Sequence, residues 1–201
     1  MYTLVTSVSS PYGRKVRVVM DILGLAGEFQ LQDASTQDPD DPIRTINPLG
    51  KIPALITEAG DAVFDSRVII DFLDARHGDG GLIPRGTEAR ARVLTLAALA
   101  EGINDALLLV TYEGRYREPE QASDVWLDHQ MGKIRRGLEA AIERLDEFQA
   151  PNLAAVTLAC ALGYADWRKQ IDWRAEYPAL VPWLDGFAAA VPGFEATKPP
   201  V

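Results

Sequence analysis

The sequence predicts two domains of different fold class, an α/β domain with a mixed sheet over residues 1–77 and an all-helical domain over residues 87–201. Residues 1–77 alternate short apolar runs with turns, which is typical of an α/β unit. The rest of the chain keeps apolar residues at spacings of three and four, the period of helices. Residues 78–86, Gly-Asp-Gly-Gly-Leu-Ile-Pro-Arg-Gly, are rich in glycine and predict a linker between the two domains.

The first domain is predicted to run β-α-β-(α)-β-β-α. Four apolar runs predict its strands: residues 2–6, 29–32, 52–56 and 62–64. A helix is predicted to begin at Ser10-Pro11, because serine caps helices and proline is favoured in the first turn. Residues 38–46 are polar and allow a short helix, and Ser66 opens another helix. The last two strands form a hairpin, so the sheet is mixed and a doubly wound parallel fold is excluded.

The second domain is predicted to contain four long helices. Their apolar residues recur over four ranges: residues 93–110, 127–148, 153–164 and 177–190. The run 153–164 is apolar nearly all round, so it predicts a buried central helix that Asn152 caps and that holds Cys160 as a core thiol. Pro192-Gly193 is expected to end the last helix.

Composition and charge limit the classes of function. The chain has 201 residues and a net charge of −9, which argues against binding to nucleic acid or to anionic lipid. One cysteine cannot form an internal disulfide, and with only two histidines it cannot assemble a Cys/His zinc site. We therefore expect no metal. The chain begins without a basic signal segment and lacks an apolar run of about 20 residues, so a cytoplasmic protein with no membrane span is expected.

The first motif with chemical potential joins the first strand to the first helix. Its sequence is Ser9-Ser10-Pro11-Tyr12-Gly13-Arg14-Lys15. A hydroxyl at a helix N-terminus stabilises an anion such as a thiolate, because the helix dipole and its unpaired N–H groups lie beside it. Taken alone, the motif favours the simpler interpretation, in which Ser10 only caps the helix and Arg14 and Lys15 lie on a solvated face.

Two further motifs precede a strand and a helix. A proline at the start of a strand, as in Ile52-Pro53, leaves backbone groups without ladder partners, so a cis bond there would present Ile52 to an extended peptide. Only about 5–6% of X–Pro bonds in folded proteins are cis, so the sequence leaves that geometry open, and taken alone the motif favours a simple turn into an edge strand. Asp65-Ser66 at a helix start offers a carboxylate site, although helix capping alone explains it equally well.

The three motifs, in this order, with Leu82-Ile83-Pro84 and an all-helical second half, resemble the glutathione S-transferase superfamily. The resemblance covers essentially the whole chain and is strongest to small bacterial members that use serine or cysteine instead of tyrosine. It implies a thioredoxin-like N-terminal domain that binds glutathione. It also implies a helical domain that supplies most of the second-substrate pocket, and a homodimer.

The resemblance implies a role for each motif. Ser10 falls at the position of the family's catalytic hydroxyl, with Ser9 as the alternative. The glutathione-binding positions implied by the family are Lys51, Ile52, Pro53, Asp65 and Ser66. Among them, Ile52 would pair its backbone with the cysteinyl unit, Pro53 would be the cis-proline, and Lys51 would meet a carboxylate. Asp65 and Ser66 would hold the γ-glutamyl end.

The second-substrate pocket is expected between Tyr12 and the first long helix. Its candidate residues are aromatic or cationic: Tyr12, Tyr112, Arg115, Tyr116 and Trp167, with Arg117 and Arg168 beside them. Such residues suit a planar acidic or aromatic substrate, although an ordinary amphipathic helix end explains them equally well. Asp105, on the first long helix, would reach the glutathione bound to a partner subunit.

The function implied is that of a cytoplasmic detoxification enzyme, a glutathione transferase acting on small hydrophobic electrophiles or peroxides. Two alternatives remain, a non-catalytic glutathione-binding module and a glutathione-dependent disulfide reductase. The reductase is disfavoured because the turn Ser10-Pro11-Tyr12-Gly13 lacks both cysteines of the thioredoxin motif. A dehalogenase or an isomerase with the same glutathione site also remains open.

Overall fold

The computed structural model of the chain describes residues 1–149 and 151–200. They fall into two compact units. The first unit comprises residues 1–83 and the C-terminal segment that begins at Val191, and the second runs from Pro84 to Ala190. The sequence pattern held no signal that the C-terminal segment groups with the first unit.

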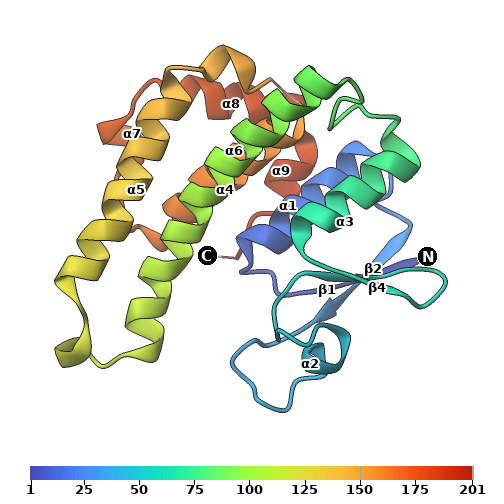
Figure 1. The fold of residues 1–201 in the computed structure, drawn as a ribbon, viewed down its shortest axis with the longest axis horizontal. Helices are drawn as coiled ribbons and strands as arrows, with labels where there is room; N and C mark the ends of the chain where they lie inside the picture. Colours follow the sequence, from blue (N-terminus) through green and yellow to red (C-terminus); the bar gives the residue numbers. More distant parts are fainter. Residues whose placement is uncertain (150, 201) are drawn as a thin grey trace. The chain divides into compact units, whose positions relative to one another are not determined.

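A four-stranded mixed sheet forms the centre of the first unit (Figure 1). Its strands are β1 (Tyr2–Thr6), β2 (Phe29–Asp33), β3 (Ala54–Ile56) and β4 (Ala62–Val63), in the order β2-β1-β3-β4. The pair β1–β2 is parallel, whereas β1–β3 and β3–β4 are antiparallel. The predicted mixed sheet is therefore confirmed.

Two helices connect these strands and a third follows β4. They are α1 (Pro11–Ile22), α2 (Ile43–Ile46) and α3 (Ser66–Leu73). Figure 1 shows α1 and α3 together on one face of the sheet, with α2 on the other side. Fully buried apolar side chains from α1, α3 and the sheet make the core between them, among them Leu4, Val19, Leu55, Ile69 and Leu73.

The face of α1 predicted to be solvated is buried. Arg14 is 4% exposed and Lys15 is 1% exposed, so the expectation of a solvated face is wrong. The Arg14 guanidinium lies 4.0 Å from the centre of the Phe194 ring, and its Nη2 donates to the Phe194 carbonyl at 2.7 Å. The C-terminal segment therefore covers this face of α1, which explains why charged side chains can be buried there.

Phe194 belongs to a short helix that the sequence did not predict, α9 (Pro192–Ala196). The helix predicted over residues 177–190 does end at Ala190, just before Pro192, but Pro192 begins a further helix, so the expectation that the earlier one is the chain's last helix is wrong. The physical reason is that proline is well tolerated in a first helical turn, where its missing N–H would have no acceptor.

The second unit is all-helical, as predicted. Its helices are α4 (Thr87–Tyr116), α5 (Asp124–Ile142), α6 (Leu153–Arg168), α7 (Trp173–Glu176) and α8 (Leu180–Ala190). The predicted central helix α6 is confirmed: it is buried along most of its length, and the Asn152 side chain accepts the Ala155 N–H at 2.9 Å. Cys160 is 1% exposed, as expected for a core thiol. Figure 1 shows α4 and α5 side by side.

In the second unit, one predicted helix ends early and one helix was not predicted. Helix α5 ends at Ile142, before the predicted end at residue 148, and a 3₁₀ turn follows over Leu145–Glu147. Phe148 is nevertheless 2% exposed, so the apolar pattern continued although the α-helix did not. Helix α7 was not predicted, because four residues are too few to show a period.

One helix, α4, is long and apolar enough to cross a membrane by length and composition alone. Half of its apolar window is buried within the protein, as in the core helices of water-soluble folds. Helix α4 packs against both α5 and α6. It is therefore weak evidence for membrane insertion, and no membrane protein is indicated.

Candidate active site

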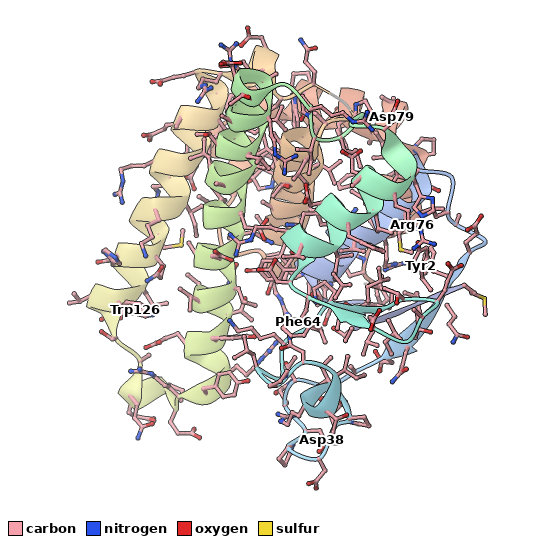
Figure 2. The ribbon with its side chains drawn as sticks, turned by 45° about the vertical axis from the view of Figure 1, so that its right-hand side comes forward. Tyr2, Asp38, Phe64, Arg76, Asp79 and Trp126 are labelled. Atoms are coloured by element: carbon pink, nitrogen blue, oxygen red, sulfur yellow. The ribbon has the colours of Figure 1, made fainter. Side chains whose placement is uncertain are left out.

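The three motifs converge on one end of the sheet because of strand register. Val5, near the end of β1, pairs with Ala54 at the start of β3. Leu55 pairs in turn with Val63 at the end of β4. The segments that leave these strand ends carry the serine turn, the proline loop and the Asp-Ser pair, so motifs far apart in sequence lie together. Figure 2 shows Phe64 at this end and Tyr2 at the opposite end of the sheet.

Ser10 caps helix α1. Its backbone is extended, with φ −78° and ψ 119°, and its Oγ accepts the Gly13 N–H at 3.1 Å. The predicted cap is therefore confirmed. Because Oγ accepts this bond, its own proton is left for an outside acceptor, and a hydroxyl that accepts one hydrogen bond is a stronger donor of the next. Ser10 is 8% exposed, so its own side chain is largely shielded from bulk water.

Ser9 has a different environment. Its Oγ lies 3.0 Å from the Ser7 Oγ, and it takes no part in the cap of α1. Ser9 is half-buried, outside the helix. Of the two serines, only Ser10 combines a hydroxyl with the positive end of the helix dipole.

Glycine is required three residues after Ser10. A Cβ on Gly13 would clash with the Thr6 side chain, because α1 crosses closely over the end of β1. This close approach holds the start of the helix, and with it Ser10, against the sheet. The sequence motif contained this glycine, but its packing role depends on the crossing of helix and strand.

The peptide bond between Ile52 and Pro53 is cis, the geometry that the sequence left open. The ladder of β3 begins at Ala54, and no hydrogen bond from residues 1–149 or 151–200 reaches the Ile52 N–H or carbonyl. These backbone groups are therefore available to an extended peptide. Lys51, beside them, is exposed.

The turn before this loop is braced by a residue that sequence reasoning missed. Asn47 is 2% exposed, its Nδ2 donates to the Lys51 carbonyl at 2.9 Å, and its Oδ1 accepts the Leu49 N–H at 3.1 Å. Gly50 has φ +61°, the left-handed region that glycine adopts without strain. An asparagine followed by proline is a turn signal, so this role had a local cue.

Asp65 and Ser66 begin helix α3. Asp65 Oδ1 accepts the Arg67 N–H at 2.9 Å, and Arg67 Nη2 donates to Oδ2 at 2.9 Å. Burial raises the pKa of Asp65, but the hydrogen bonds and positive charge of Arg67 outweigh it and hold the pKa below its ordinary value. Ser66 is 2% exposed in the first helical turn, where backbone N–H groups lack helical acceptors. An anion at Asp65 thus stands beside N–H donors at Ser66.

The other candidates lie in the second unit, apart from Tyr12, which is half-buried in the first turn of α1. Tyr112 and Tyr116, in the last turns of α4, have ring centres 5.3 Å apart and nearly perpendicular planes. The Arg115 guanidinium lies 5.0 Å from the centre of the Tyr112 ring. Burial raises the pKa of the Tyr112 phenol above its ordinary value.

The end of α6 carries a second cation on aromatic rings. The Arg168 guanidinium lies 4.0 Å from the Trp167 ring centre, and its Nε donates to the Tyr164 hydroxyl at 3.2 Å. The Tyr164 hydroxyl lies 3.1 Å from the Thr111 Oγ1 on α4. Thr111 precedes Tyr112, so this contact joins the ends of α4 and α6. We call the joined residues the aromatic–arginine cluster: Thr111, Tyr112, Arg115 and Tyr116 of α4 with Tyr164, Trp167 and Arg168 of α6.

Sequence reasoning missed Thr111 and Tyr164 as members of this cluster. The four-residue spacing of Tyr164 and Arg168 indicated that they share a helix face. No local pattern indicated that Tyr164 contacts Thr111 of α4. The structure does not bring two other residues into the cluster. Arg117 pairs with Glu113 at 3.5 Å, and Asp105 lies on an exposed side of α4.

Over the described ranges 1–149 and 151–200, no three His, Cys, Asp or Glu side chains are grouped to hold a metal ion.

Profiles of known domain families match both parts of the chain. The N-terminal domain of glutathione S-transferase matches residues 4–81, and the C-terminal domain of glutathione S-transferase matches residues 124–186. An Escherichia coli protein described as an uncharacterized GST-like protein, YibF, is 31% identical over 98% of both chains. A maleylacetoacetate isomerase from Pseudomonas aeruginosa is 29% identical over 99% of this chain and 95% of its own length.

Solved structures are similar over the whole chain. A glutathione transferase family member from Pseudomonas fluorescens Pf-5, with bound glutathione, is 43% identical with a TM-score of 0.91. The same relative with bound S-(propanoic acid)-glutathione has a TM-score of 0.89. Both comparisons cover 100% of both chains.

Proposed function

The chain belongs to the glutathione S-transferase superfamily, and from this premise we propose that it is a glutathione transferase that uses Ser10 to hold the glutathione thiol as a thiolate. One observation carries the proposal. The Ser10 hydroxyl caps α1 at the sheet end where the three family motifs meet, and its proton is directed to no helical partner.

The surrounding groups supply the binding contacts for the rest of glutathione. The unused backbone of Ile52, next to cis-Pro53, pairs with the cysteinyl unit as an added strand would. The Asp65 carboxylate attracts the α-amino group of the γ-glutamyl end, and the Ser66 hydroxyl and N–H donate to its α-carboxylate. Lys51 meets the other carboxylate as an exposed point charge.

The thiol is activated because both groups near Ser10 favour its charged form. A free thiol has a pKa of about 8.5, so only a few per cent is thiolate at neutral pH. A shift of about 2 units requires roughly 2.7 kcal/mol of preferential stabilisation of the anion. A hydroxyl donor and a helix N-terminus together can supply that amount.

The chemical step uses the thiolate as nucleophile. The sulfur attacks an electrophilic carbon, a C–S bond forms, and the electron pair leaves with the departing group or is protonated on the product. With a peroxide, the sulfur attacks one oxygen, an S–O bond forms as the O–O bond breaks, and the alkoxide leaves and takes a proton from water. A second glutathione thiol then attacks the resulting sulfenic acid, which gives glutathione disulfide and water. Dithiol exchange is not supported, since Ser10 and Gly13 replace both cysteines and Cys160 is buried in α6.

An isomerase is the second candidate, favoured by the full-length similarity to maleylacetoacetate isomerase. The same thiolate would add to a double bond, allow rotation about the resulting single bond, and leave again. Glutathione consumption separates the two, because a transferase consumes one glutathione per turnover and an isomerase consumes none.

Conjugation kinetics with 1-chloro-2,4-dinitrobenzene test the proposal. Ser10→Ala is expected to lower kcat/KM at pH 7 by at most about 20- to 30-fold, the change in thiolate population if the whole shift of about 2 pKa units were lost. Ser9→Ala is the matched control and is expected to keep the wild-type value. Equal losses in the two variants, or glutathione binding without turnover, would contradict a Ser10-based transferase. Glutathione binding without turnover would favour a non-catalytic binding module.

The assembly and cellular setting belong to the same proposal. We expect a cytoplasmic homodimer that acts in detoxification, with Asp105 on the exposed side of α4 reaching the glutathione of a second copy. Sedimentation equilibrium tests the dimer. Glutathione affinity of Asp105→Ala, measured above and below the dissociation concentration of the dimer, tests the shared contact.

A further inference from the structure

Two arginines of the second unit lie on aromatic rings and not on carboxylates. The Arg115 guanidinium is 5.0 Å from the Tyr112 ring centre, and that of Arg168 is 4.0 Å from the Trp167 ring centre. Within residues 1–149 and 151–200, neither is within ion-pair distance of an acid. Other arginines of this unit do form ion pairs: Arg92, Arg117, Arg135, Arg144 and Arg174.

This contrast is informative because acids are plentiful. The chain has 29 aspartates and glutamates against 20 lysines and arginines. Arg115 and Arg168 are both half-buried, and a half-buried cation without a counter-ion is costly. A site for neutral, apolar electrophiles would gain nothing from two such groups. A site for anionic substrates needs them, because the net charge of −9 otherwise repels an anion.

The guanidinium groups are also held in place before any ligand arrives. Arg168 Nε donates to the Tyr164 hydroxyl, which in turn lies against Thr111 of α4. Its two Nη groups remain for a ligand. A guanidinium stacked on an aromatic ring is weakly hydrated, and its fork of N–H groups matches a carboxylate. Tyr116, 60% exposed, adds an open aromatic face to the cluster.

We propose that Arg115 and Arg168 make this enzyme selective for conjugated electrophiles that carry a carboxylate, an inference that rests on the proposed transferase function. The guanidinium groups bind the carboxylate, and Tyr112, Tyr116 and Trp167 contact the conjugated body. In the reaction the glutathione sulfur bonds to the β-carbon of the conjugated ketone. The π electron pair moves to the carbonyl oxygen, and the resulting enolate takes a proton from water at its α-carbon.

A matched pair of substrates tests the selectivity. They are 4-oxo-4-phenylbut-2-enoate and its methyl ester, which share the electrophilic carbon and differ in charge. Arg115→Gln and Arg168→Gln are each expected to lower kcat/KM for the acid by about tenfold to a hundredfold, the range for a hydrogen bond to a charged group. Both are expected to lower kcat/KM for the ester far less than for the acid, because the ester has no negative charge to pair with the guanidinium groups.

The control is Arg136→Gln, which removes the same charge from an exposed site on α5 and is expected to change neither substrate. Arg168→Lys keeps the charge without the fork and is expected to retain part of the acid activity. Equal losses for acid and ester would show that the arginines only hold α4 and α6 together, and would overturn the proposal.

A binding measurement separates this proposal from the proposed function. If wild type turns over neither of these substrates nor 1-chloro-2,4-dinitrobenzene, the transferase proposal fails. The carboxylate proposal is then decided by calorimetry with the saturated acid, 4-oxo-4-phenylbutanoate. Binding of the acid but not its methyl ester, lost in Arg115→Gln and Arg168→Gln, would support the two arginines as a carboxylate site. No binding of the acid to wild type would overturn it.

Discussion

The sheet end of the first unit and the aromatic–arginine cluster of the second are built by different means. At the sheet end, backbone geometry presents the functional groups: a helix cap at Ser10, a cis bond before Pro53 and a second cap at Asp65. The cluster depends on side chains from helices distant in sequence, such as Thr111 and Tyr164, which are 53 residues apart.

The difference teaches where specificity resides in the molecule. A site built from backbone groups suits a ligand that does not change. Helix N-termini bind carboxylates and strand edges bind peptide groups, whatever side chains the ligand carries. A cluster of side chains can change its ligand by substitution without altering the fold. We therefore expect substitutions at the sheet end to affect glutathione, and substitutions in the cluster to affect only the second substrate.

The largest expected effect is on the sheet end. Gly13→Val forces a side chain into Thr6, and we expect about 3 kcal/mol of lost stability together with loss of glutathione binding. Urea unfolding measures the loss. The matched control is Gly114→Ala on α4, where no atom lies within 4 Å of the new Cβ. Gly114→Ala is expected to stabilise the protein slightly. A large loss of stability in this variant would contradict the contrast between the sheet end and the helices of the second unit.

Asn47→Ala is expected to have the next largest effect. It removes the two hydrogen bonds that brace the Pro48–Lys51 turn, at a cost of about 1–3 kcal/mol. Because Ile52 follows this turn, glutathione affinity measured by calorimetry is expected to fall with stability. Asn47→Asp keeps the acceptor for Leu49 and loses only the donor to Lys51, so its loss is expected to be intermediate. Unchanged affinity in Asn47→Ala would rule out a positioning role.

Tyr164→Phe probes the cluster. It removes the hydroxyl shared by Arg168 and Thr111, and the expected cost is about 1 kcal/mol. The KM for the second substrate is expected to rise while the glutathione affinity stays constant. Tyr177→Phe, at a half-buried tyrosine outside the cluster, is the control. Weakened glutathione binding in Tyr164→Phe would contradict the division of labour between the two regions.

The smallest expected effect concerns pH. Because Arg67 holds the pKa of Asp65 below its ordinary value, the folded state favours the carboxylate. This stability is present above the unfolded-state pKa of Asp65 and is lost as the pH falls through its folded-state pKa. Asp65→Asn is therefore expected to be slightly less stable than wild type at pH 7, by less than about 1 kcal/mol because the pair is exposed. Urea unfolding at pH 7 and pH 3 should show the difference shrinking in acid.

Much of the first unit was predictable because its signals are local. The strand Tyr2–Thr6, the cap at Ser10 and the start of α3 at Ser66 follow from residue types at adjacent positions. The buried state of Arg14 was not predictable, because its partner Phe194 lies 180 residues further along the chain. The same holds for α9, whose burial depends on that contact.

The second unit was predictable as helices but not as a site. Apolar periodicity identified α4 and α6, yet it could not show which of their polar faces meet. Periodicity also misled at Leu145 and Phe148, because a 3₁₀ turn can bury apolar residues at helical spacings. Side-chain clusters such as Arg168–Tyr164–Thr111 depend on tertiary packing, and no local pattern encodes it.

The most direct test of the central claim is the thiolate absorbance of bound glutathione, titrated against pH for wild type, Ser9→Ala and Ser10→Ala. We predict a bound thiol pKa well below the free value of about 8.5 in wild type and in Ser9→Ala. In Ser10→Ala it should return towards the free value. A low pKa that survives Ser10→Ala would contradict the account and transfer the stabilisation to Ser9 or to the N-terminus of α1.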